Sequence, residues 1–175
     1  MRVEGFAYRA RQLWNAYRAA PSQQDLDEVR AILNPGEMGL FEGMQPSEQA
    51  HSVAVMRRLR AQDPLSQDLL VAALLHDVGK SLYPLSMWER VLIVLVGALS
   101  SGLLARWGAG EPRGWRLAFV VARQHPQWGA DMAARQGASP LAVELIRQHQ
   151  NYLPADTVLS TDTLLGKLQA ADGNS

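Results

Sequence analysis

Apolar residues recur along most of this chain at helical spacing and not in alternation. Val53, Met56 and Leu59 give one example, and Leu141 and Leu145 give another. The pattern predicts an all-α fold, a single-domain helical bundle of about eight or nine helices. The expected helices cover residues 3–20, 22–33, 47–61, 66–77, 86–99, 113–124, 126–136, 140–150 and 161–171.

Start and stop signals support this division. Ser86 and Glu89 have the spacing of a capping box, and Pro140 follows Ser139 at a first helical position, where its missing N–H is not needed. Stretches rich in Gly or Pro at 34–36, 108–112 and 153–154 predict breaks between helices. We interpret these breaks as loops within one domain.

The most apolar stretch runs over residues 91–105. As a helix it would be shorter than the roughly 30 Å needed to cross a bilayer, so no transmembrane segment is expected. We interpret it as a buried helix in preference to a contact with a membrane surface. For the longer segment 84–112 three interpretations stay open: a lid, a surface for a homodimer, or additional core.

Composition narrows the classes of function. The 17 basic and 17 acidic residues give a formal net charge of +0, so stable binding of nucleic acid is not expected. The chain has no cysteine, which excludes disulfides, thiolate zinc sites and cysteine nucleophiles and leaves histidines and carboxylates as metal ligands. The first twenty residues lack the continuous apolar run of a signal peptide, and we expect a cytoplasmic protein.

One segment carries candidate chemistry. An apolar run at 72–75 leads directly into His76 and Asp77, and Gly79 and Lys80 follow. Adjacent residues on a helix point about 100° apart, so His76 and Asp77 can reach one ion only near a helix end or across a shared pocket. Lys80 is then placed to meet an anion held by that ion. The alternative is a buried histidine beside a capping aspartate.

The chain has only four histidines, and each lies in or beside a predicted helix with apolar neighbours. They are His51, His76, His125 and His149. Together with Asp77 they would form a set of nitrogen and oxygen donors that suits first-row divalent ions such as Mn, Fe or Co. A ligand histidine usually donates its second ring nitrogen to a carboxylate or carbonyl, and Glu48, one turn before His51, is the expected partner there.

In order and context these residues resemble the HD superfamily of metal-dependent phosphohydrolases. The pattern of that superfamily is a first His, a His-Asp pair, optionally two further His, and a final Asp on a helical bundle. Asp172 matches the final Asp, with Asp162 and Asp156 as alternatives. The resemblance covers residues 47–172, which suggests an HD domain at 47–175 and an N-terminal helical extension, 1–46, packed on its core. The branches most similar in pattern are the HD-GYP-related proteins and the hydrolases of diadenosine tetraphosphate.

The resemblance implies a function and a ligand set. It implies two divalent ions, Mn, Fe, Co or Mg, and a phosphohydrolase that cleaves a phosphate ester or anhydride of a nucleotide or dinucleotide by attack of a metal-bound hydroxide. Asp77 would bridge the ions and, with Lys80, would be catalytic. The alternative is a catalytically silent module that senses a nucleotide or binds a protein. The implied metal ligands are His51, His76, Asp77, His125, His149 and Asp172.

Residues outside the motif would select the small phosphorylated substrate. Arg123 has a forked set of donors that suits phosphate, and Arg57, Arg113 and Arg116 are further candidates. Trp128 and Tyr152 lie close in sequence to His125 and His149 and could stack on a base. We therefore expect Lys80, Arg123, Trp128 and Tyr152 to bind substrate.

Overall fold

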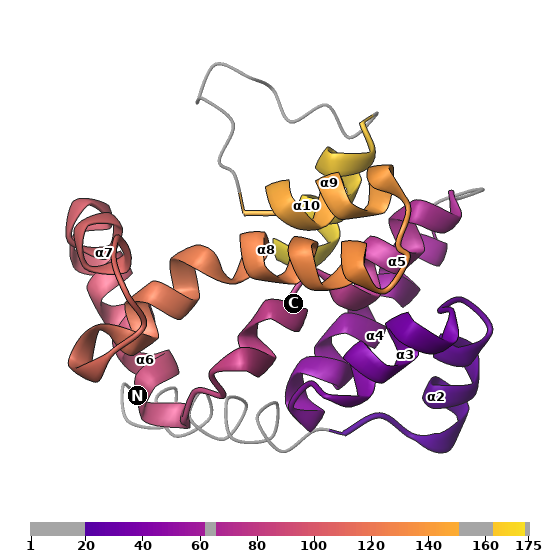
Figure 1. Cartoon of the computed structure of the whole chain (residues 1–175), viewed down its shortest axis with the longest axis horizontal. Coiled ribbons are helices and arrows are strands. Elements are labelled where there is room, and N and C mark those ends of the chain that lie inside the picture. The colour runs from indigo at the N-terminus through magenta and orange to yellow at the C-terminus, as the bar shows by residue number, and fades with distance from the viewer. Residues whose placement is uncertain (1–19, 62–65, 151–162, 174–175) are drawn as a thin grey trace, which may run out of the picture.

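A computed structural model describes residues 20–61, 66–150 and 163–173, and every regular element in those ranges is helical (Figure 1). The all-α prediction is confirmed. The expected helix 3–20 lies almost entirely outside the described residues. The elements are α2 (Gln23–Arg30), α3 (Pro35–Glu42), α4 (Pro46–Arg60), α5 (Gln67–Leu75), η1 (Val78–Leu82), α6 (Met87–Leu99), α7 (Ser101–Gly108), η2 (Gly114–Arg116), α8 (Leu117–Arg135), α9 (Pro140–Gln148) and α10 (Leu164–Gly173).

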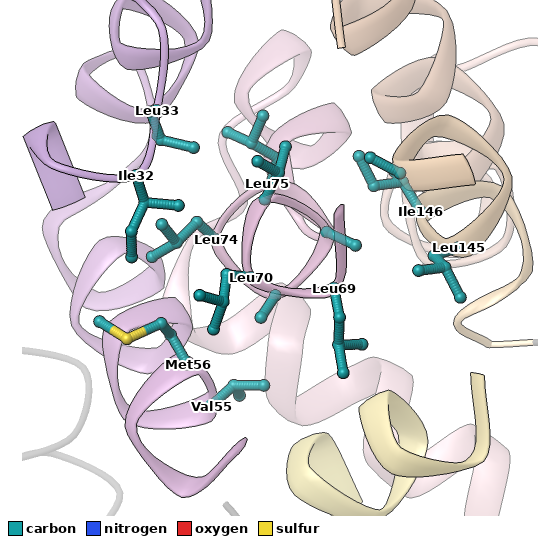
Figure 2. Close-up of a cluster of buried hydrophobic side chains, with 14 of the residues drawn as sticks. Ile32, Leu33, Val55, Met56, Leu69, Leu70, Leu74, Leu75, Leu145 and Ile146 are labelled. Carbon is teal, nitrogen blue, oxygen red and sulfur yellow. The ribbon is translucent and has the colours of Figure 1, made fainter. Parts of the chain in front are cut away.

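Helix α5 runs through the centre of the bundle. Every residue from Leu69 to Leu75 is buried, as expected for a helix that is apolar on all sides. Figure 2 shows α5 nearly end-on, with Met56 of α4 on one side and Ile146 of α9 on the other. Helices α2 and α3 add Val29 and Phe41 to this core. The next residue after this buried helix is His76, so the core fixes the position of the His-Asp pair.

Two helix boundaries differ from the sequence prediction. Residues 34–36 were predicted as a loop, but an additional helix, α3, begins there. Asn34 caps this helix, and Pro35 occupies its first position. Pro126 lies inside one continuous helix, α8, where two helices were expected. Proline removes one backbone hydrogen bond, but α8 buries residues on both sides of Pro126, and this burial outweighs the lost bond.

The apolar segment 91–105 also differs from the prediction. It forms the two helices α6 and α7, and α6 contains no buried residue, so the interpretation as a buried helix is wrong. Both helices lie at one end of the molecule, away from α2 and α3 (Figure 1). In the part of the chain that the structure describes, no single helix has the length and hydropathy to cross a membrane. One pair, 67–82 with 87–99, passes that test on length and composition only and is bent by 106°.

Candidate metal centre

Five helices bring the six predicted ligands to the end of α5. His76 follows its last residue, and Asp77 precedes η1. The other four lie on α4, α8, α9 and α10 or directly at their ends. They form two groups in which the ligand atoms lie within 4.8 Å of one another: His51, His76 and Asp172 in one, and Asp77, His125 and His149 in the other. We call them the outer group and the inner group.

Asp77 lies between the two groups. Its Oδ1 is 3.2 Å from Nε2 of His125 and 3.8 Å from Nε2 of His149, within the inner group. Its Oδ2 is 3.6 Å from Nε2 of His76, in the outer group. The two carboxylate oxygens thus face different groups, which is the arrangement that a bridging ligand needs.

The outer group is the more accessible of the two. Nε2 of His51 lies 2.9 Å from Oδ1 of Asp172, and Nε2 of His76 lies 3.6 Å from the same oxygen. His51 and Asp172 are partly exposed, whereas His76 and all three inner residues are buried. An ion in the outer group would therefore keep access to solvent and to a substrate.

Backbone carbonyls fix the ring orientation of three histidines. Nδ1 of His76 lies 2.9 Å from the Ala73 oxygen, and the rings of His125 and His149 make the same contact with carbonyls of their own helices, at 2.9 and 2.8 Å. Because a carbonyl only accepts, each Nδ1 must carry the proton and donate, which leaves Nε2 as a bare lone pair in the neutral ring.

These three Nε2 atoms are the strongest indication of a metal. Each is buried and has no hydrogen-bond partner among the residues that the structure describes. Burying a lone pair without a partner costs free energy. A divalent cation is a suitable partner here, because imidazole nitrogens and carboxylate oxygens are ligands that such ions bind. The backbone contacts of the Nδ1 atoms are also those typical of metal-ligating histidines. The residues present therefore fit a metal ion.

The pKa values agree with a site built for positive charge. Burial alone would raise the pKa of Asp77, but Lys80 and the surrounding histidines outweigh it and hold that pKa well below its usual range. Burial, with His76 next in importance, lowers the pKa of His149 to about 3. Burial and the nearby Lys80 also lower the pKa of His125. The inner group consequently presents an ionised carboxylate and two neutral imidazoles at neutral pH, the protonation state that metal binding requires.

The element η1 places Lys80 and holds the site against α8. Nζ of Lys80 donates to Oδ2 of Asp77 at 2.6 Å, and the lysine side chain is partly exposed. Gly79 packs directly on the backbone of α8: a Cβ there would overlap the His125 carbonyl oxygen and lie 2.8 Å from the Gly129 nitrogen. Only glycine allows η1 and α8 to approach this closely.

The other predicted residues lie in different surroundings. The carboxylate of Glu48 binds Arg90 at 2.6 Å and accepts from the Gln45 backbone, so the expected partnership with His51 is wrong. Arg123 donates to the Ala105 oxygen of α7 at 2.9 Å.

Trp128 packs beside Tyr83, with ring centroids 5.5 Å apart, and against the small apolar cluster around Leu85. Tyr152 lies outside the described residues, as do the alternatives Asp156 and Asp162. Substrate binding by Arg123, Trp128 and Tyr152 stays a prediction.

One supporting residue was not predicted. Arg58 of α4 donates to the Ala171 carbonyl at 3.0 Å, one residue before Asp172, and so ties the last turn of α10 to the helix that carries His51. Nothing in the sequence separates Arg58 from its neighbours Arg57 and Arg60. Arg57 instead pairs with Asp25 and Glu28 of α2, on the surface.

The family model described as the HD domain matches residues 49–173, more than half of the chain. No curated protein and no solved structure matches significantly. The matched region begins just before His51 and ends just after Asp172, so it includes all six residues of the two groups.

Proposed function

The chain belongs to the HD domain family, whose members are mostly metal-dependent hydrolases, and on that premise we propose that it hydrolyses a phosphate ester or anhydride. The observation that carries the proposal is the position of Asp77, whose two oxygens face two groups of donors with three bare, buried Nε2 atoms. Sites with two adjacent metal ions commonly catalyse in-line displacement at phosphorus.

We propose that His51, His76 and Asp172 hold one ion and His125 and His149 a second, with Asp77 shared. When bound, divalent ions supply a water of lowered pKa and neutralise charge on the phosphoryl oxygens. A set rich in imidazole favours Mn, Fe or Co over Mg.

The protein's own groups have distinct roles in this scheme. The Nδ1 contacts to backbone carbonyls keep the imidazoles of His76, His125 and His149 in the tautomer that presents Nε2. Lys80 shares Oδ2 of Asp77, and its partly exposed ammonium group can donate to a phosphoryl oxygen without leaving the site. We assign Asp77 and Lys80 as the catalytic residues.

The proposed substrate is a small phosphorylated molecule, with a nucleotide or dinucleotide as the specific form. The partly exposed outer group would give such a substrate access to a bound ion, whereas the residues of the inner group are all buried. Trp128 and Tyr152 remain candidates for stacking on a base, and Arg123 for a second phosphate.

Elemental analysis of the purified protein, with turnover of p-nitrophenyl phosphate esters and a nucleotide panel after addition of Mn²⁺, tests the proposal. We expect metal-dependent turnover that Asp77→Asn abolishes, because this variant removes a ligand of both groups. Asp131→Asn, on the exposed side of α8, is the matched control and should keep metal and activity.

The possible results separate the proposal from its alternatives. Metal without turnover would leave a silent, ligand-sensing HD domain. Absence of both from folded protein, or full activity in Asp77→Asn, would overturn the metal centre itself.

A further inference from the structure

The hairpin formed by α6 and α7 lies at one end of the molecule (Figure 1). It exposes an apolar face there. The side chains of Leu99, Trp88, Val94 and Leu95 are 84%, 81%, 68% and 56% exposed. Monomeric proteins rarely expose contiguous apolar surface of this kind unless something binds there. We call this exposed side of α6 the apolar face.

The apolar face is broad and contains no charge. At 100° per residue the exposed positions of α6 span an arc of about 160°. The exposed positions are Trp88, Leu92, Val94, Leu95, Ala98 and Leu99. The two charged residues of α6 are used elsewhere, since Glu89 caps the helix through Ser86 and Arg90 binds Gln45 and Glu48 of the core. A seam for one partner helix is narrower than this arc.

The hairpin is held firmly in this exposed position. Arg90 fixes the start of α6 to α4 through bonds of 2.6 Å. Arg123 and Gln124 of α8 bind backbone carbonyls of α7 and the loop after it, at 2.9 to 3.1 Å. Trp107 of α7 packs edge-on against Phe119 of α8, with ring centroids 5.1 Å apart. The hairpin thus presents its apolar face without support from a partner.

The segment that follows α6 adds positive charge and aromatic rings. Residues 101–116 contain Arg106, Arg113 and Arg116 but only one acidic residue, Glu111. The three arginines are exposed, and Trp115 is 62% exposed with Arg116 over its ring, 5.1 Å from the centroid. Exposed aliphatic residues together with exposed tryptophan and arginine are the combination found where proteins enter the interface of an anionic membrane.

We propose that the apolar face of α6 docks on the surface of an anionic lipid bilayer, with the arginines of 101–116 meeting the lipid headgroups. Lipid accounts for both the breadth of the face and the positive charge of the segment that follows it. A second copy of the chain fits less well, because in a two-fold pair both copies contribute the same basic segment and that segment offers no matching excess of acidic residues. The docking is peripheral: it needs only the exposed side of the hairpin to enter the interface.

Co-sedimentation of the full chain with vesicles tests the proposal. We expect binding to vesicles of phosphatidylcholine mixed with phosphatidylglycerol, weaker binding to phosphatidylcholine alone, and a blue shift of tryptophan emission on binding. Leu99→Glu and Leu95→Glu should each weaken binding about tenfold or more, because each puts a charge where a leucine would be buried. The matched control is Leu141→Glu: Leu141 is exposed on α9, outside the face, and its variant should bind like the wild type.

A second pair of variants tests the role of charge. Arg106→Glu should weaken binding to the anionic vesicles only, whereas Arg135→Glu, which changes the net charge equally at the exposed end of α8, should bind like the wild type. Equal effects of the two would mean diffuse attraction and overturn the assignment to this face.

Three other results would also overturn the proposal. The first is that the folded wild type binds neither kind of vesicle. The second is that the wild type forms a dimer and that Leu99→Glu dissociates it. The third is that vesicle binding appears only after residues 1–19 are removed. The second result would identify another copy as the occupant of the face, and the third would identify the chain's own N-terminal segment.

Discussion

Replacing Gly79 by alanine tests whether the contact between η1 and α8 shapes the metal centre. The added Cβ would lie 2.8 Å from the Gly129 nitrogen and 2.9 Å from the carbonyl carbon of His125, and closer still to that carbonyl's oxygen. Ordinary contact begins at 3.4 Å, and these are backbone atoms that cannot rotate away. The two elements must therefore separate, by roughly 1 Å.

Two consequences follow from this separation. Overpacking of this kind destabilises a protein by about 1–3 kcal/mol. Asp77 lies at the start of η1 and His125 lies on α8, so the 3.2 Å approach of Oδ1 of Asp77 to Nε2 of His125 would be lost. We expect weaker metal binding and a fall in any phosphohydrolase activity of up to about 100-fold, the size of loss that a 1 Å misplacement can cause.

Two other glycines provide a graded comparison. A Cβ at Gly129 would approach its neighbours only to 3.1 and 3.2 Å, so Gly129→Ala should have a smaller effect of the same sign. A Cβ at Gly39, on the exposed side of α3, would meet nothing within 4 Å, and Gly39→Ala should stabilise the chain by about 0.5–1 kcal/mol. Urea denaturation and elemental analysis measure both effects. If Gly79→Ala has the same urea midpoint and the same metal content as Gly39→Ala, the contact between η1 and α8 does not shape the site.

The remaining predictions concern the two groups separately. Asp172→Asn should remove about one equivalent of metal from the outer group, and His149→Gln should remove about one equivalent from the inner group. Loss of all metal in both variants would mean that the two groups do not bind metal independently. In metal-free protein the pKa of His149 is about 3 in the folded state and 6.5 in the unfolded state. As the pH drops, the unfolded state therefore binds a proton before the folded state does. The free energy of unfolding falls between about pH 6.5 and pH 3. The loss from His149 is at most about 5 kcal/mol. The raised pKa of His76 does not offset it, because the stability that His76 contributes changes only above pH 6.5 and is constant below it. Denaturation midpoints between pH 6.5 and 3 should show the loss, and a flat profile would contradict the prediction. Arg58→Ala should loosen Asp172 and weaken the outer group about tenfold while sparing the inner group, with partial recovery in Arg58→Lys; metal titration distinguishes this from a uniform loss.

Much of the fold was predictable because helices are local. Spacing of apolar residues sets which segments are helical, and hydroxyl and proline signals set where they begin, as Ser86 and Pro140 show. The boundaries that failed are those where packing overrides local preference. Pro126 should end a helix, but burial on both sides keeps α8 continuous.

The candidate ligands were also predictable, since they are the chain's four histidines and two aspartates in a distinctive order. The sequence could not show how they divide. That Asp77 directs one oxygen to each group depends on the position of α5 relative to α4, α8 and α9. The same dependence on packing explains why Glu48 binds Arg90 and not His51.

The sequence by itself thus determined an all-helical chain of the HD family and the atoms available to bind a metal. The tertiary structure alone decided which of those atoms meet, that Arg58 supports Asp172, and that the apolar helix α6 lies on the surface. The physical reason is that periodicity is a property of one segment: it shows that a helix has an apolar side. What covers that side, and which way a polar side chain turns, depends on neighbours that are distant in the sequence.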